Sequence, residues 1–396
     1  MVLVETGSNY ETKSENGLSH FLEHMCFKGT KKRPKSIDIS RELDSLGAEN
    51  NAFTSREMTG YYAKGEKKHF RKLLDVISDM YLSPTLPKED LEKERGVILQ
   101  EISMYEDLPK RKVWDELWTL LYGETPAGRP IIGPVKNIKK FSRSDFVNYR
   151  RRHYIAEKTI IIVAGDVNAR KAVAEVKKYF KTIPRGKKIQ KPKVAATQKA
   201  PALRVHKKST DQTHMIMAFR AFGAGDKKMG ALYILSEVLG QGMSSRLWQK
   251  MREELGACYY IGAHANNYSD YGILSIAIGI ESHRAVEVTS ALLEECHKLR
   301  DTLVPESELE KAKEHFLGHL YMGLETTDSL ADFYGDQEIS AKKLKTPSEI
   351  EKEIRKLTAE DIRRMAREVF RDEKLNLAIV GDISDSKGIK KTLTLG

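Results

Sequence analysis

Two histidines and a glutamate lie within five consecutive residues near the start of the chain, in the segment HFLEH at residues 20–24. Residues four apart on a helix face the same way one turn apart, so His20 and His24 share a face, and Glu23 lies on it too. The apolar residues recur at helical spacing on the opposite side, at Leu18, Phe21, Leu22, Met25 and Cys26. The triplet is therefore expected to project away from the packing face of the helix.

Imidazole nitrogens from successive helical turns can bind one zinc ion, and a glutamate between them can act as general base on water that the metal activates. This order of residues inverts the commoner H-E-x-x-H pattern and is typical of a class of zinc peptidases. The alternative is a surface helix with two ordinary histidines. Cys26 falls on the apolar side, so we expect it in the core rather than among metal ligands.

Two histidines leave a catalytic zinc short of its usual three protein ligands. A helix predicted at residues 88–106 carries Glu94 and Glu101, which are seven apart and nearly aligned on one face. Carboxylates are frequent on solvated helices, so either glutamate alone would be read as a surface residue. They become candidate site residues only if the two histidines bind zinc. Glu101 is a candidate for the missing ligand.

The composition, with 40% hydrophobic and 31% charged residues among 396, is that of a globular protein long enough for two or more domains. No stretch approaches the roughly 18 apolar residues of a membrane span, and no export signal is visible at the N-terminus. Three widely spaced cysteines do not suggest a disulfide framework. We expect a cytoplasmic protein without a membrane partner.

The net charge of +11 raises the question of nucleic acid. The basic residues are spread along the predicted helices and mixed with acidic ones, and the densest run, residues 185–193, falls in a predicted linker. A solvated surface explains this pattern, so we expect no nucleic-acid partner. A preference for acidic peptides remains open.

The two halves of the chain repeat each other. LEKERGVILQEI at residues 91–102 matches LEKAKEHFLGHL at 309–320, and residues 141–167 match residues 357–383 over their whole length. The second match includes TIIIV at residues 159–163, which is predicted to be a buried strand. Internal duplication therefore predicts an α+β protein with two homologous α/β-sandwich domains of the same topology.

The predicted boundary between these domains is the proline- and lysine-rich stretch 184–201, which leaves domains at residues 1–183 and 202–396. The metal residues are not repeated in the second domain. Aligning GLSHFLEHM on GALYILSEV places Tyr233, Ser236 and Glu237 at the triplet positions, and Glu101 falls on His319. We therefore expect a zinc site in the first domain and a metal-free second domain.

Four blocks of sequence carry a resemblance to a known family: GLSHFLEHMCFKGT, NAFTSREMTGYYA, LEKERGVILQEI and IIIVAGDV. With them the chain resembles the pitrilysin/insulinase-type zinc peptidases, the inverzincins, and most closely their short, processing-peptidase-like subfamily. The resemblance implies a zinc-dependent endopeptidase that hydrolyses unstructured peptides with one zinc per chain. The alternative is a non-catalytic peptide-binding or assembly subunit, although such members typically lose the metal triplet.

The resemblance assigns a role to each candidate residue of the first domain. It implies that His20, His24 and Glu101 are the zinc ligands and that Glu23 is the general base. Glu94 matches a second family glutamate that supports the site.

The resemblance also implies where the substrate binds. Asn51, Ala52 and Phe53 match an edge strand to which the substrate adds as an extra β-strand. The family usually begins with two further strands before the one predicted at residue 2, so the first domain is expected to lack them here.

Arg252 and Tyr259, seven apart in the second half, match a family pair that reaches the active site, with the tyrosine placed to stabilise an oxyanion. Without the resemblance they would be a surface arginine and a core tyrosine, and Tyr260 is easily confused with Tyr259. In long family members, the zinc site and this pair lie in opposite halves of a four-domain clamshell. A two-domain chain is half of a clamshell, so we expect a homodimer that forms a peptidase chamber with active sites completed in trans.

Overall fold

The computed structural model describes residues 1–195 and 198–396, and these form two compact units. Unit 1 contains Met1–Met104, Arg129–Pro192 and Leu324–Ile339, and unit 2 contains Tyr105–Gly128, Lys193–Gly323 and Ser340–Gly396. The units are therefore not the sequential ranges 1–183 and 202–396, because each unit takes a segment from the other half of the chain. Residues 196–197 of the expected linker lie outside the described residues.

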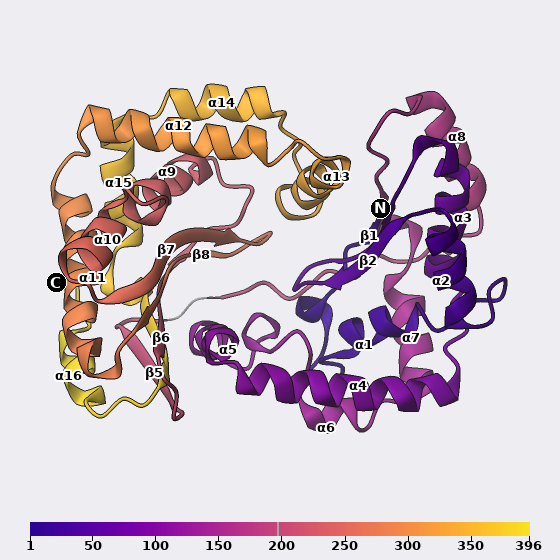
Figure 1. The fold of residues 1–396 in the computed structure, drawn as a ribbon, viewed down its shortest axis with the longest axis horizontal. Helices are drawn as coiled ribbons and strands as arrows, with labels where there is room; N and C mark the ends of the chain where they lie inside the picture. Colours follow the sequence, from indigo (N-terminus) through magenta and orange to yellow (C-terminus); the bar gives the residue numbers. More distant parts are fainter. Residues whose placement is uncertain (196–197) are drawn as a thin grey trace. The chain divides into compact units, whose positions relative to one another are not determined.

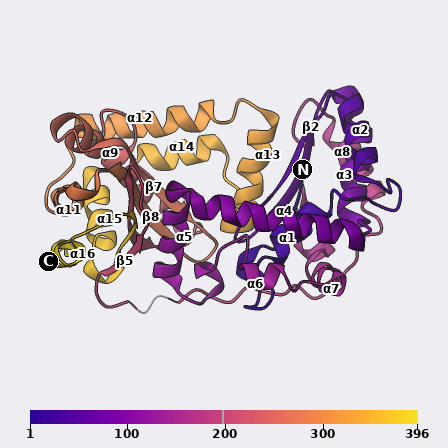
Figure 2. The ribbon, with the colours of Figure 1, turned by 60° about the horizontal axis from the view of Figure 1, so that its bottom comes forward.

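Unit 1 is built on a four-stranded antiparallel sheet with strand order β2-β3-β1-β4. Its strands are β1 (Val2–Val4), β2 (Glu49–Thr54), β3 (Thr59–Lys64) and β4 (Thr159–Ile161). Its helices are α1 (Leu18–Met25), α2 (Ser36–Ser45), α3 (Phe70–Leu82), most of α4 (Lys88–Asp107), α6 (Val135–Ile138), α7 (Arg143–His153), α8 (Ala169–Tyr179) and α13 (Thr327–Asp336). The long helix α4 runs alongside α1 in both views of the ribbon (Figure 1, Figure 2).

Unit 2 is built on a five-stranded sheet with strand order β5-β9-β6-β8-β7, in which only β5 and β9 are parallel. Its strands are β5 (Ala202–Lys207), β6 (Thr213–Ala221), β7 (Cys258–Asn267), β8 (Gly272–Ile280) and β9 (Leu375–Gly381). Its helices are α5 (Pro109–Tyr122), α9 (Met229–Gly240), α10 (Arg246–Trp248), α11 (Ala285–Asp301), α12 (Glu306–Met322), α14 (Pro347–Arg355), α15 (Ala359–Val369) and α16 (Ser386–Thr392). Two sheets with packed helices confirm the predicted α+β class.

Two helices, α5 and α13, belong to the unit formed mainly by the other half of the sequence. Each of them directly follows one of the two long repeated helices, α4 and α12. Helix α5 follows α4 and packs Leu117 and Leu121 against Ile216 and Val380 of the second sheet, in a core separate from that under α9 and α11. Helix α13 follows α12 and belongs to unit 1, where a Cβ at Gly335 would lie 2.5 Å from Leu3 Cδ1. Each helix therefore covers a sheet that its own half of the sequence does not supply.

Strand β4 is shorter and less buried than predicted. It ends at Ile161, and its residues are half-buried, whereas all of its repeat partner β9 is buried. The reason is its place in the sheet: β9 lies between β5 and β6, while β4 is paired within the described residues with β1 alone. No helix of the described ranges combines the length and apolar character needed to cross a membrane.

Candidate metal centre

Helix α1 carries the histidine–glutamate triplet opposite its buried face. Leu18, Phe21, Leu22 and Met25 are all buried, as the apolar spacing predicts. Cys26 is also buried, and the Tyr61 hydroxyl donates a hydrogen bond to its Sγ at 3.5 Å. Burial raises the pKa of this thiol to about 11, so Cys26 is a core residue, as expected.

The N-terminus of α1 is held by a buried carboxylate that the sequence interpretation missed. Glu11 accepts hydrogen bonds from the backbone N–H groups of Gly17 at 2.9 Å and Ser19 at 2.7 Å. Burial raises the pKa of Glu11, and these hydrogen bonds oppose the rise. Gly17 adopts φ 101°, and a Cβ there would lie 2.7 Å from the Ile132 carbonyl oxygen, so glycine is required. An acidic residue shortly before a predicted helix was the available signal.

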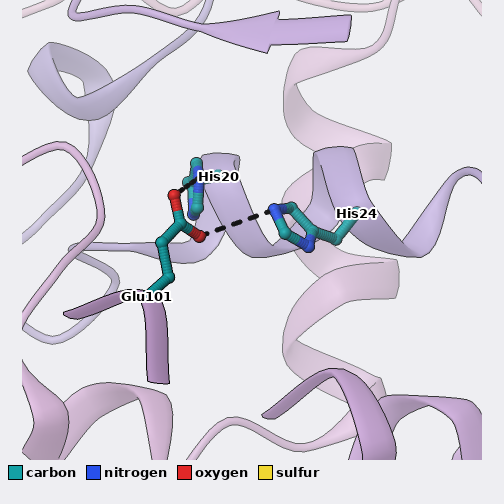
Figure 3. Close-up of side chains that lie close together, drawn as sticks. All are labelled: His20, His24 and Glu101. Carbon is teal, nitrogen blue, oxygen red and sulfur yellow. Dashed lines mark ion pairs between the residues drawn. The ribbon is translucent and has the colours of Figure 1, made fainter. Parts of the chain in front are cut away.

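His20, His24 and Glu101 meet at one point, with the histidines on α1 and the glutamate on α4 (Figure 3). One candidate ligand atom from each residue lies within 4.8 Å of the other two. Nε2 of His20 is 3.7 Å from Oε1 of Glu101, and Nε2 of His24 is 3.9 Å from Oε2. This is the one such group of His, Cys, Asp and Glu side chains found in the part of the chain that the structure describes.

Glu94 lies beside the group of His20, His24 and Glu101 and contacts His24. Its Oε2 is 3.1 Å from Nδ1 of His24, and its Oε1 is 2.6 Å from Nζ of Lys28. In the tautomer with the proton on Nδ1, His24 donates to Glu94 and leaves the Nε2 lone pair facing Glu101. The geometry is therefore that of a carboxylate which orients a histidine ring.

Glu23 is fixed by a residue from the neighbouring sheet. The Thr54 hydroxyl, at the end of β2, donates to Oε2 of Glu23 at 2.6 Å. Burial raises the pKa of Glu23, while the Thr54 hydrogen bond and the His24 ring lower it and Glu101 raises it further. Thr54 was not among the predicted site residues, although it directly follows the predicted substrate stretch.

The predicted substrate residues Asn51, Ala52 and Phe53 lie on β2, which is an edge strand of the sheet. The strand pairs with β3 on one side, with Asn51 opposite Tyr62 and Ala52 opposite Tyr61. The backbone N–H of Ala52 donates to the side-chain Oδ1 of Asn51 at 2.9 Å. Because β2 is an edge strand, the Ala52 N–H could exchange the Asn51 side chain for a carbonyl of an added strand.

Arg252 and Tyr259 contact each other in unit 2. The guanidinium carbon of Arg252 lies 5.2 Å from the Tyr259 ring centroid, and its Nη1 donates to the Cys258 carbonyl at 2.9 Å. The pairing of β7 with β8 shifts register between Cys258 and Tyr260, so Tyr259 occupies a bulge and is 74% exposed. The hydroxyl oxygen of Tyr260 instead lies 2.8 Å from Nδ1 of His214. The bulge therefore distinguishes the two tyrosines.

Two family models and several curated proteins match this chain over most of its length. A family model described as Insulinase (Peptidase family M16) matches residues 1–135, and another described as Peptidase M16 inactive domain matches residues 140–316. A Bacillus subtilis protein named as an uncharacterized zinc protease is 34% identical over 94% of this chain and 90% of the relative. A Streptomyces coelicolor protein with the same kind of name is 30% identical over 98% of this chain and 85% of the relative.

A solved structure of a protease from Helicobacter pylori has the same fold, with a TM-score of 0.88 at 23% identity over 96% of this chain and 93% of that one. The family model for the first half covers His20, Glu23, His24 and Glu101, and the description of the second as inactive agrees with a second half that lacks the triplet. The chain belongs to the pitrilysin/insulinase-type peptidase family, M16.

Proposed function

We propose that this protein is a zinc-dependent endopeptidase that hydrolyses unstructured peptides and binds one catalytic zinc per chain. The observation that carries the proposal is the meeting of His20, His24 and Glu101 beside the carboxylate of Glu23. The names of the relatives as zinc proteases support the same reaction class.

The three side chains fit a zinc ion. Ligand atoms of a tetrahedral zinc site lie about 3.3 Å apart, given metal–ligand distances of about 2.0–2.2 Å. The separations of 3.7 and 3.9 Å between the histidine nitrogens and Glu101 are a few tenths of an ångström longer, and no two of the three candidate ligand atoms are more than 4.8 Å apart, so side-chain rotations can bring all three onto one ion. Two histidines and one carboxylate are a common ligand set of catalytic zinc, which supplies Lewis-acid activation of water and of a peptide carbonyl when bound.

Glu23 is the proton carrier in this proposal. Its carboxylate takes a proton from the attacking water and passes one to the leaving amine. The Thr54 hydrogen bond fixes the orientation of the carboxylate, and Glu94 fixes the ring of His24. These contacts hold the groups in place before substrate arrives, which lowers the cost of organising them during the reaction.

The substrate binds as an added strand on the open edge of β2. The Ala52 N–H, held by the Asn51 side chain in the free protein, donates to a substrate carbonyl, and Phe53 continues the strand. Main-chain pairing gives affinity with little demand on side chains, which suits varied unfolded peptides.

The active site is completed in trans in a homodimer. The zinc residues belong to unit 1, and Arg252 and Tyr259 belong to unit 2, where the bulge presents Tyr259 to solvent. In the proposed dimer, the pair from one subunit reaches the zinc face of the other and stabilises the oxyanion. Two-fold symmetry gives two equivalent sites and a peptide chamber between the subunits.

The metal assignment is tested with Glu101→Gln. We expect this variant to lose zinc on mild chelation that leaves the wild-type protein with one zinc per chain, because two imidazoles make an incomplete site. Glu89→Gln, at an exposed position at the start of the same helix, is the matched control and keeps its zinc. Full zinc occupancy of Glu101→Gln by elemental analysis rules out Glu101 as a ligand.

A further inference from the structure

Unit 2 contains a cluster at the position that corresponds to the zinc centre of unit 1. The internal repeat aligns α9 with α1 and α12 with α4, and it places Glu237 at the position of His24 and His319 at that of Glu101. The position of His20 is taken by Tyr233, which stacks on Phe316. In unit 2 the glutamate therefore lies on α9 and the histidine on α12, whereas in unit 1 the histidine lies on α1 and the glutamate on α4.

A second histidine restores the number of metal-binding side chains. His315 lies four residues before His319 on α12, and the two ring centroids are 4.4 Å apart at an interplanar angle of 51°. The rings of His20 and His24 on α1 have nearly the same relation, at 4.8 Å and 56°. Both helices thus present two imidazoles from successive turns.

The carboxylate of Glu237 completes the cluster from α9. Its Oε2 lies 2.7 Å from Nδ1 of His315, and its side chain is 12% exposed. Burial raises the pKa of Glu237, and the neighbouring rings of His315 and His319 lower it. A half-buried carboxylate paired with one imidazole, with a second imidazole one helical turn away, provides the nitrogen and oxygen donors that transition-metal cations prefer, rather than the all-oxygen set of calcium or magnesium.

We propose that Glu237, His315 and His319 form a second divalent-metal site, with the histidines supplied by α12 and the carboxylate by α9, in place of the metal-free second domain that the sequence predicts. This set is more open than that of unit 1, because His319 is exposed and the donor atoms of the three side chains do not all lie within the 4.8 Å that joins those of His20, His24 and Glu101. The site therefore binds zinc or cobalt more weakly than the catalytic centre, in addition to the one catalytic zinc. Its existence does not depend on the proposed peptidase activity.

A metal at this site would tie α9 to α12 and fix the loop between α9 and α10. A Cβ at Gly242 in this loop would lie 3.1 Å from Nε2 of His315, so the loop backbone packs directly on the ring. Because ligands that bind only the folded state stabilise it, the metal raises the melting temperature of unit 2.

The test uses the full chain with His20→Ala and His24→Ala, so that the catalytic centre cannot contribute, and without a histidine tag. Titration with Co²⁺, followed by its visible ligand-field bands and by equilibrium dialysis, is expected to give one bound ion per chain that Zn²⁺ displaces. Adding His319→Ala or Glu237→Gln is expected to weaken binding more than about tenfold. His283→Ala is the matched control, because His283 faces Glu281 at 3.4 Å on an exposed surface.

Zinc is also expected to raise the melting temperature of the double variant and to leave that of the His319→Ala derivative unchanged. His319 is exposed, so this substitution leaves the packing of α12 intact. The proposal is overturned if the double variant binds no stoichiometric metal, or if His283→Ala weakens binding as much as His319→Ala. Neither result bears on the zinc centre of unit 1, which is absent from every protein in the test.

Discussion

Glu23 must be ionised to accept a proton, and Thr54 helps to keep it so. The Thr54 hydroxyl donates to the carboxylate at 2.6 Å and thereby lowers a pKa that burial raises. Substituting Thr54→Val removes this donor at nearly constant volume, so the pKa of Glu23 rises. We expect the acid limb of the pH profile of kcat/KM to move to higher pH, with several-fold lower activity on that limb. An unchanged acid limb in peptide hydrolysis would remove Thr54 from the account.

The residues of the centre differ in how far the sequence reveals them. His20, Glu23 and His24 are readable from spacing on one helix, whereas Glu101 needed the requirement for a third ligand and the family resemblance. Thr54 and Glu11 were missed because their partners come from other elements, and a hydrogen bond between distant segments leaves no periodic pattern.

In the proposed function, substrate binding depends on the edge strand β2. Substituting Ala52→Pro removes the N–H that Asn51 holds in the free protein, and proline is tolerated at sheet edges. We expect kcat/KM for an unstructured peptide to fall about tenfold, which corresponds to the loss of roughly one hydrogen bond. Ala52→Ser keeps the N–H and is expected to retain activity. Similar losses in both variants, with unchanged melting temperatures, would contradict strand addition.

Elements with strong local patterns were predicted better than those defined by their neighbours. The apolar spacing around Phe21 fixes the buried face of α1. The length of β4 depends on which strands flank it, and the bulge at Tyr259 depends on register with β8. The length of β4 and the position of the bulge are therefore not encoded in either short segment itself. The bulge is the feature that exposes the Tyr259 side chain to solvent.

At the scale of the whole molecule, duplication was readable from repeated segments, but the exchange of α5 and α13 between units was not. An amphipathic helix shows that one face is buried without showing which sheet covers it. Leu117 and Leu121 would suit either sheet by composition, and the contacts with Ile216 and Val380 decide it.

Assembly is tested by mixing two inactive variants, Glu23→Gln and the double substitution Arg252→Ala with Tyr259→Phe. In a mixed dimer completed in trans, one site carries both defects and the other carries none. Random exchange then restores about one quarter of wild-type activity, because half of the dimers are mixed and each has one intact site. Subunit exchange is verified first by pull-down through a tag on one variant. A mixture that exchanges and stays inactive contradicts completion in trans.

The central claim is that Glu23 performs proton transfer at a zinc centre formed by His20, His24 and Glu101. The most direct measurement is zinc content and hydrolysis of a quenched unstructured peptide on the same sample of Glu23→Gln. The amide keeps the shape of the side chain and removes the proton acceptor, so we expect zinc as in the wild type and a rate lower by about 10²–10⁴-fold. Zinc-loaded Glu23→Gln that turns over near the wild-type rate would contradict the account.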